Sequence, residues 1–114
     1  MVAPAAGDVV VVRFPFSDLS NTKLRPAVVL ANAGRGDCKL SQATSNPYGG
    51  TSAIEVRNAS FSIAGLPVTS YARPGKLFTA SQGLMGFRAG TLRAEPFRQV
   101  IDWVVGILRG TGSP

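Results

Sequence analysis

Histidine is absent from this chain of 114 residues, and cysteine occurs once, as Cys38. A Ser–His–Asp triad needs a histidine as its base, and structural zinc sites need several thiol or imidazole ligands. The composition therefore excludes a histidine-based triad, a zinc finger and a mixed His–Cys metal site. A single thiol also cannot form a disulfide within the chain.

Carboxylates are scarce as well. The chain has six Asp and Glu residues, and none of them stand in a DxD, DxxD or ExxE pattern. Two-metal nucleases hold their ions with closely grouped carboxylates, so this class is disfavoured and no metal or other cofactor is expected. Any catalysis must then use Arg, Lys, Ser, Thr or Tyr side chains.

Long apolar runs are missing too. The most apolar run near the end, residues 103–108, is far shorter than the ~20 residues that span a bilayer. Residues 1–7 contain Pro4 and no cation, which does not fit the start of a secretory leader. We therefore expect a cytoplasmic protein with no membrane contact.

Positive charge is what the sequence has in excess. Twelve Lys and Arg residues against six acidic ones give a formal charge of +6, and nine of the twelve cations are arginines. The planar guanidinium group matches the geometry of phosphate, so the excess of positive charge indicates a polyanion or an acidic protein as partner. The alternative is a composition that serves solubility alone.

The pattern of apolar residues predicts many short strands and one helix. The length allows one domain over residues 1–114, with a core of about 7–109 and a frayed tail at 111–114. A long polar loop is expected at 15–23, and the fold class is β-rich α+β, a small, mostly antiparallel barrel with a C-terminal helix. The expected strands are 9–14, 27–30, 38–44, 53–57, one starting at Lys76, and 83–92.

The helix is predicted over residues 94–108. Phe97, Ile101, Val104 and Leu108 recur at helical spacing, and Gly110 is expected to end the helix. Such a stripe is most simply explained by packing against the core, and a partner-binding face is the alternative.

Arg25 is the first candidate for chemistry, because it precedes Pro26 at the mouth of the apolar strand 27–30. The proline favours an extended conformation at Arg25. If strands 27–30 and 38–44 pair antiparallel across the glycine-rich turn between them, Thr44 lies at the same end as Arg25. The plainer alternatives are a solvated surface arginine and a hydroxyl that is satisfied at the end of its strand.

An arginine beside a hydroxyl suits phosphate chemistry. A guanidinium group can hold two oxygens of a five-coordinate phosphorus with parallel hydrogen bonds. RNA supplies its own nucleophile, the 2′-hydroxyl, whereas DNA lacks it. Because arginine stays protonated, it serves more readily as charge stabiliser or acid than as base, and the sequence identifies no base.

Three motifs in order carry a resemblance to a known family: Gly7-Asp8 before the first strand, Leu24-Arg25-Pro26 before the second, and Gln42-Ala43-Thr44-Ser45-Asn46. They resemble the MazF/PemK family of toxin endoribonucleases, and the stretch 70–79 (SYARPGKLFT) is similar to the PemK-type branch. The resemblance implies an SH3-type, plug-like barrel, a homodimer, and metal-independent cleavage of single-stranded mRNA at short sequences. It also implies neutralisation by a cognate antitoxin.

The resemblance assigns roles to individual residues. Arg25 matches the family's arginine proposed as acid or base, and Thr44 matches its threonine that stabilises the transition state. The loop FSDLSNTKL and the pair Gln42-Ala43 depart from the commoner family pattern, so they leave the cleavage sequence open and admit an inactive protein. Lys23, Arg73 and Lys76 match no catalytic position of the family and are expected only as a basic lining for the RNA backbone. Phe16, Ser45 and Asn46 are the other residues expected to contact RNA.

Two alternatives remain for the same barrel. CcdB-type relatives use it to poison DNA gyrase by protein contact, although the segment 109–114 lacks the tryptophan-containing end expected of such an inhibitor. A catalytically inactive barrel that binds RNA or an antitoxin is the other. Replacement of Arg25 by alanine separates them, because it should abolish RNA cleavage and leave gyrase poisoning largely intact.

Overall fold

The structure is a computed structural model that describes residues 4–15, 22–44, 54–57, 60–64 and 69–111. A short 3₁₀ helix, η3 (Gln82–Leu84), separates the last two strands, and α1 (Ala94–Arg109) ends the described chain. The strands are β1 (Asp8–Pro15), β2 (Thr22–Gly34), β3 (Asp37–Thr44), β4 (Ile54–Val56), β5 (Phe61–Ala64), β6 (Ser70–Ser81) and β7 (Met85–Leu92).

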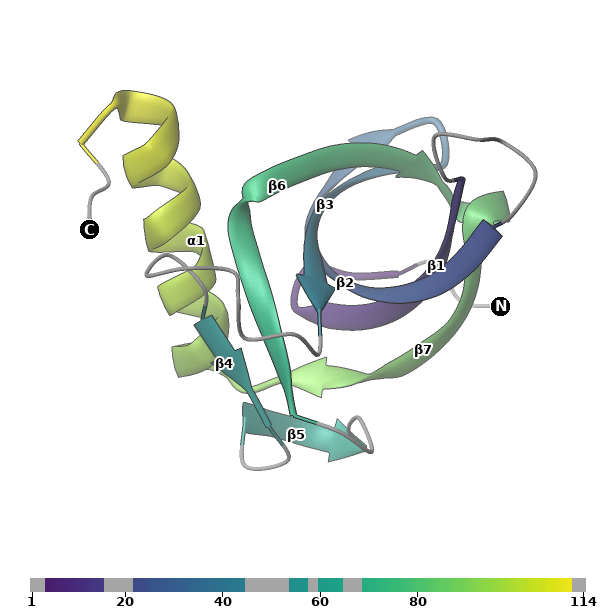
Figure 1. Cartoon of the computed structure of the whole chain (residues 1–114), viewed down its shortest axis with the longest axis horizontal. Coiled ribbons are helices and arrows are strands. Elements are labelled where there is room, and N and C mark those ends of the chain that lie inside the picture. Colours follow the sequence, from purple (N-terminus) through teal and green to yellow (C-terminus); the bar gives the residue numbers. More distant parts are fainter. Residues whose placement is uncertain (1–3, 16–21, 45–53, 58–59, 65–68, 112–114) are drawn as a thin grey trace.

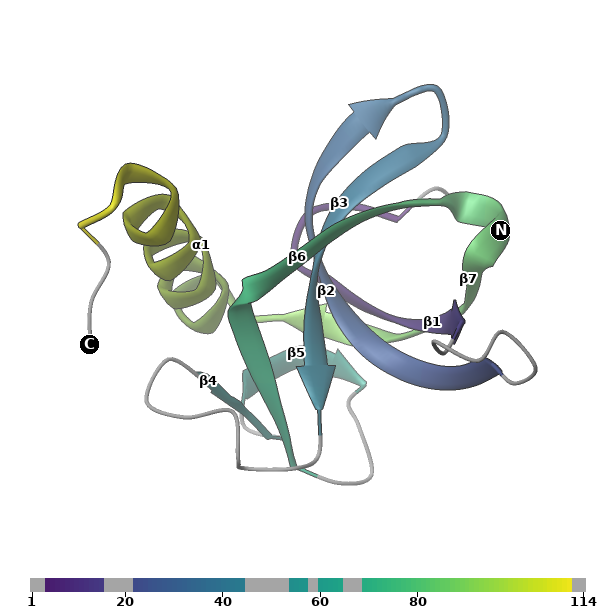
Figure 2. The same cartoon turned by 45° about the horizontal axis from the view of Figure 1, so that its top comes forward.

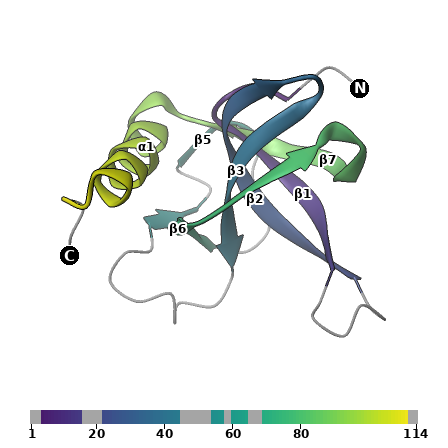
Figure 3. The same cartoon turned by 90° about the horizontal axis from the view of Figure 1, so that it is seen from above.

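The strands form one antiparallel sheet in the order β4-β6-β3-β2-β1-β7-β5. The sheet curls until β1, β2, β3, β6 and β7 surround a common interior, and α1 lies beside β6 (Figure 1). The helix stands to one side of the barrel when the molecule is turned as well (Figures 2 and 3). The predicted β-rich barrel with a C-terminal helix is confirmed.

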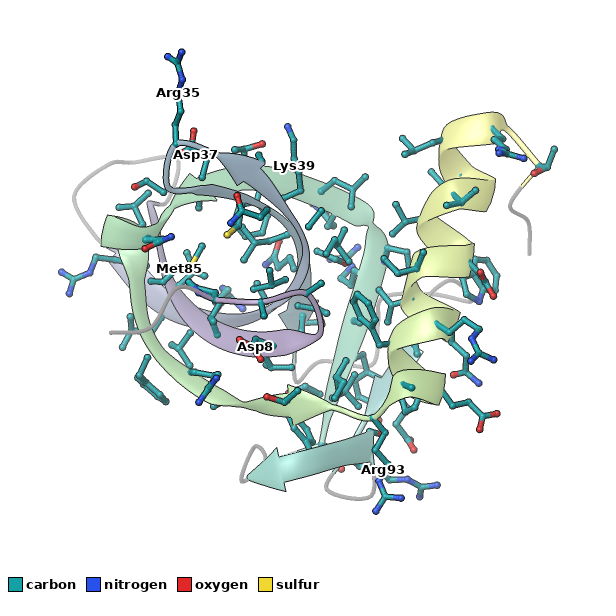
Figure 4. The ribbon with its side chains drawn as sticks, turned by 180° about the vertical axis from the view of Figure 1, so that it is seen from behind. Asp8, Arg35, Asp37, Lys39, Met85 and Arg93 are labelled. Atoms are coloured by element: carbon teal, nitrogen blue, oxygen red, sulfur yellow. The ribbon has the colours of Figure 1, made fainter. Side chains whose placement is uncertain are left out.

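The two faces of the sheet bury two separate cores, because neighbouring residues of a strand point to opposite faces. We call the face towards the barrel interior the inner face and the opposite one the outer face. Met85 points into the interior (Figure 4). The inner core contains Val10, Val12, Ala27, Val29, Cys38, Leu40, Ala80 and Met85. The outer core contains Val9, Val28, Ile54, Val56, Phe61, Ala72, Leu92, Val100 and Val104.

Helix α1 covers part of the outer face. Val100 and Val104 are buried there, and Phe97 and Trp103 pack against the same core. Gly110 ends the helix in the left-handed conformation with φ 74°, as predicted. The expectation that Leu108 belongs to the buried stripe is wrong, because its side chain is 70% exposed. It lies in the last turn, where the helix has passed the edge of the outer core.

β2 is much longer than the sequence predicted. It pairs with β1 from Val28 to Thr22, so the expected strand 27–30 was too short and the expected loop 15–23 too long. Pro26 therefore lies within the strand and not at its start. Backbone pairing in a hairpin does not depend on apolar side chains, and so the polar start of β2 gave no periodic signal.

β6 also departs from its prediction, since it begins at Ser70 and not at Lys76. Its register with β3 jumps from Ser41–Leu77 to Ala43–Ala72, and the extra residues of β6 include Pro74. Proline has no amide hydrogen and fits such an irregularity. The Ser41 hydroxyl donates to the carbonyl of Arg73 at 2.7 Å, and β6 bends sharply beside α1 (Figure 1).

The Gly7-Asp8 pair has a structural role. Gly7 has φ 94°, which favours glycine, and the buried Asp8 carboxylate accepts hydrogen bonds from the Ala5 amide at 2.8 Å and the Thr91 hydroxyl at 2.9 Å. Arg88 adds an ion pair to Asp8 at 3.7 Å. This carboxylate therefore joins the start of β1 to the end of β7.

Candidate active site at the end of the β2–β3 ladder

Arg25 is held in place by strand pairing. It lies opposite Val12 of β1, and its side chain is half-buried. Alternation along β2 places it on the same face as Ala27 and Val29, which belong to the inner core. Arg25 therefore lies where the apolar interior gives way to polar residues.

Thr44 is the last residue of β3, and only 9% of it is exposed. The pairing of β2 with β3 extends to Ala27 and Gln42. Arg25 and Thr44 each lie two residues beyond that pair, at the same end of the ladder. There the strands have different neighbours, because Arg25 pairs with β1 and Thr44 pairs with β6.

Tyr71 joins this group and was not among the residues predicted from the sequence. It lies directly opposite Thr44 across the β3–β6 pair and is half-buried. Cross-strand neighbours share one face of the sheet, so the phenol and the hydroxyl of Thr44 lie on the same face. The only sequence signal was a tyrosine two residues before the pair Arg73-Pro74, and it did not reveal which strand lay opposite.

The two predicted basic residues of β6 lie on its irregular part. Arg73 is half-buried, and its carbonyl accepts the hydrogen bond from Ser41. Lys76 is exposed and follows Gly75, where an added methyl group would lie 3.9 Å from Ile107 of α1. Arg73 therefore lies nearer to the Thr44 end of the sheet, and Lys76 lies towards the helix.

The remaining predicted RNA contacts cannot be placed. Phe16, Ser45 and Asn46 lie outside the described residues. Lys23, at the start of β2, pairs through its backbone with Phe14 of β1, and its side chain is not among those that the structure describes. In the sequence, Phe16 follows the end of β1, Lys23 lies two residues before Arg25, and Ser45 and Asn46 follow Thr44. Their contacts stay predictions.

A hollow lies elsewhere, between the β3–β6 pair and α1. Its volume is about 480 Å³, and none of the predicted catalytic residues line it. Lys39 points outward at its rim, and its ammonium group donates to the Thr79 hydroxyl at 2.7 Å (Figure 4). The hollow is therefore separate from the candidate catalytic residues. The lining consists of Leu30, Lys39, Leu40, Leu77, Phe78, Thr79, Val104 and Leu108.

Within the described ranges, no three His, Cys, Asp or Glu side chains gather where they could hold a metal ion. Metal independence stays a prediction that a chelator tests directly. None of the helices described in the structure combines the length and apolarity needed to cross a membrane.

Known structures share this architecture. MazF from Deinococcus radiodurans matches with a TM-score of 0.74 at 21% identity, covering 96% of this chain and 99% of that one. The chain has the fold of the MazF toxins. MazF in the MazE–MazF complex of the same organism matches with a TM-score of 0.73 at 19% identity, over 96% and 98% of the two chains.

A third match is an endoribonuclease in complex with its cognate antitoxin, from a mycobacterial species. Its TM-score is 0.69 at 17% identity, with 100% of both chains covered. No family model matches the sequence. No curated protein matches it either. The predicted resemblance is therefore confirmed as a MazF fold, reached with few identical residues.

Proposed function

We propose that this chain is the toxin of a toxin–antitoxin system and cleaves single-stranded mRNA at short sequences, which inhibits translation and growth. Two matched proteins of this fold are named as an endoribonuclease and as MazF, and this supports the proposal. The observation that carries it is the position of Arg25 and Thr44 at one end of the β2–β3 ladder, on the face of the inner core.

The proposed reaction is an internal transfer within RNA. The 2′-oxygen attacks the adjacent phosphorus as its proton passes to a base, the bond from phosphorus to the 5′-oxygen breaks, and that oxygen takes up a proton. The products are a 2′,3′-cyclic phosphate and a 5′-hydroxyl. No external nucleophile is needed, so the protein must position the bond and stabilise the charge.

Arg25 and Thr44 have separate roles in this reaction. The guanidinium group of Arg25 binds the two non-bridging oxygens as negative charge builds up on them. The Thr44 hydroxyl donates a further hydrogen bond to the same group. Tyr71, opposite Thr44, is the described side chain best placed to give a proton to the leaving 5′-oxygen.

The two alternatives are less well supported. A gyrase poison of the CcdB type would not require an arginine and a threonine at the end of this ladder, and the matched proteins reported above bear the names of RNA-cleaving toxins. An inactive barrel would keep RNA or antitoxin binding without cleavage. Cleavage itself therefore discriminates among the three.

Partners follow from the same proposal. Two of the matched MazF-fold proteins are in complex with an antitoxin, which supports a cognate antitoxin for this chain as well. We further propose a homodimer that acts in the cytoplasm on single-stranded RNA, without a cofactor.

The test is cleavage of a long single-stranded transcript by the purified protein in the presence of EDTA, read by primer extension. Wild type should give discrete stops that define the cut sequence. Arg25→Ala should abolish them, and Thr44→Ala should slow their appearance on the order of a hundredfold, since loss of one charge-stabilising donor costs about that much.

Arg98→Ala is the matched control, because it removes an exposed arginine that belongs to α1 and not to the ladder. It should cleave like wild type. Bands that persist unchanged in Arg25→Ala would point to a contaminating nuclease or a misplaced site. Absence of cleavage by folded wild type on diverse transcripts would overturn the enzymatic proposal.

A further inference from the structure

Six large apolar side chains are exposed in the described part of the chain. Three of them, Leu77, Val105 and Leu108, belong to β6 and α1. The other three are Leu24 at 58%, Leu84 at 48% and Phe87 at 55%. These belong to β2, η3 and β7, on the side of the barrel that α1 does not cover (Figure 1).

Strand pairing brings Leu24 and Phe87 onto one surface. Val11 of β1 lies between Pro26 of β2 and Phe87 of β7, so these three residues form one row across the sheet. The next row along β1 contains Arg13 opposite Leu24. Val11 and Arg13 alternate with the inner-core residues Val10 and Val12, which places both rows on the outer face.

A β-bulge turns Phe87 outward. Met85 pairs with Val12 and points into the barrel, whereas Phe87 pairs with Val11 after the register shifts. Gly86 is the extra residue, and a methyl group on it would lie 3.4 Å from the Val11 carbonyl oxygen. The bulge at Gly86 therefore turns the Phe87 ring towards solvent, where the regular alternation would have placed it on the inner face with Met85.

The charge of this surface is positive. Arg13 is exposed within it. The carboxylates of the described residues lie elsewhere: Asp8 is buried, Asp37 starts β3, Glu55 is on β4, and Glu95 and Asp102 are on α1. Asp8 pairs with Arg88, the neighbour of Phe87, but its carboxylate is buried. An exposed aromatic ring beside an arginine, with no exposed carboxylate described in the same rows, is the combination that binds single-stranded RNA through a stacked base and a phosphate.

We propose that this surface, which we call the Phe87–Arg13 surface, binds a nucleotide of the RNA substrate outside the cleaved bond. The base stacks on Phe87, and Arg13 contacts the phosphate next to it. This inference rests on the proposed function, because it assumes that the substrate is single-stranded RNA.

The position of Arg25 connects the two sites. Arg25 lies between Leu24 and Pro26 in β2, with its side chain on the opposite face. Among the described residues, the pairing of β2 with β3 stops at Ala27, and β1 lies between β2 and β7 in the sheet. An RNA strand that contacts both sites runs from the inner face at Arg25 round the sheet to the outer face, and there across β2 and β1 to Phe87.

The test is fluorescence anisotropy of a labelled, cleavage-resistant 2′-fluoro RNA of random sequence, 16 nucleotides long, with wild type and variants. Phe87→Ala should weaken binding roughly tenfold, the order expected for loss of one stacked base. Phe87→Trp should retain affinity, and its added indole should lose fluorescence when RNA binds. Arg13→Ala should weaken binding and lower the slope of log affinity against log salt by about 0.7.

Controls distinguish a failure of this inference from a failure of the proposed function. Arg98→Ala removes an exposed arginine from α1 and should keep the wild-type affinity and salt slope. Cleavage by wild type together with unchanged RNA binding in Phe87→Ala and Arg13→Ala would overturn this inference alone. A different pair of results would show that the surface contacts protein and not RNA. In that case Phe87→Leu binds RNA as well as wild type does, and Phe87→Ala fails to dimerise or to bind the antitoxin. No RNA binding by wild type would overturn the proposed function as well.

Discussion

At the scale of single residues, strand pairing decides what a side chain can do. Arg25 lies next to inner-core residues because Val12 lies opposite it and Ala27 follows two positions later. Thr44 lies opposite Tyr71 for the same reason. The pair Arg25-Pro26 is readable in the sequence, but the tyrosine that shares the site is not, because its partner strand is 27 residues earlier in the chain.

Tyr71→Phe tests whether the phenol moves a proton. The variant keeps the ring and loses only the hydroxyl, so the fold should be preserved. The rate of cleavage under single-turnover conditions should fall on the order of a hundredfold, as expected for loss of a general acid. Affinity for the cleavage-resistant RNA should stay the same.

Thr79→Ala is the control for Tyr71→Phe, because it removes an exposed hydroxyl from the same strand near α1. It should cleave like wild type. A parallel fall in RNA affinity and rate for Tyr71→Phe would instead indicate that Tyr71 positions the substrate and does not move the proton.

The buried thiol of Cys38 predicts how the stability of the fold depends on pH. Burial raises the pKa of this thiol above its ordinary value of 9.0, and the negative charge of Asp37 raises it further. Below pH 9.0 the thiol is neutral in both states, so its contribution to stability is fully present. As the pH rises through the folded-state pKa, the unfolded thiol has already ionised, and that contribution is lost.

The free energy of unfolding, measured by urea titration, should therefore fall more steeply above pH 9 in wild type than in Cys38→Ala. The difference between the two curves isolates the thiol from the lysines and tyrosines that titrate in the same range. Equal slopes would show that the environment of Cys38 does not disfavour the thiolate.

At the scale of elements, irregular strands shape the molecule as much as regular ones. The shifted register of β6 around Pro74 lets the strand bend beside α1. The bulge at Gly86 exposes Phe87 while Met85 stays buried. Arg93 precedes α1 and donates from Nε to the carbonyl of Phe61 at 3.2 Å, which ties the start of the helix to β5 (Figure 4).

The packing of α1 can be tested with one substitution at two positions. Val100 is fully buried against the outer core, whereas Val105 is 39% exposed. Val100→Ala should lower the free energy of unfolding by about 2 kcal/mol, because it removes two methyl groups from a filled core. Val105→Ala should change it by less than about 0.5 kcal/mol.

Urea unfolding at neutral pH measures both variants. Similar losses at the two positions would mean that the exposed side of α1 is covered in solution. Similar small changes would mean that α1 contributes little to the stability of the barrel.

At the scale of the whole molecule, the homodimer is the open prediction. One chain has a mass of 11.9 kDa, and the exposed side chains of Leu77 and Leu108 border an apolar hollow of about 480 Å³. Sedimentation equilibrium across micromolar concentrations should give twice the mass of one chain. A mass of 11.9 kDa throughout that range would contradict the dimer.

The sequence by itself determined which chemistries are excluded and which elements are apolar. The absence of histidine needs no structure to interpret, and the runs 9–14 and 94–108 predicted β1 and α1 within a residue or two. The pair Arg25-Pro26 and the segment around Thr44 were readable because each lies at the end of an apolar run. These signals are local, so they can be read from the sequence without knowing which strands pair.

Only the tertiary structure decided which residues meet. The polar start of β2 and the first half of β6 carried no periodic signal, because backbone pairing with a neighbouring strand holds them. The short β5 places Phe61 in the outer core, but its four residues are too few to show a period. Tyr71 opposite Thr44 and Phe87 beside Val11 depend on register, and in β6 and β7 the register shifts at bulges. A one-residue shift exchanges the faces of a strand, and the sequence of that strand alone does not fix it.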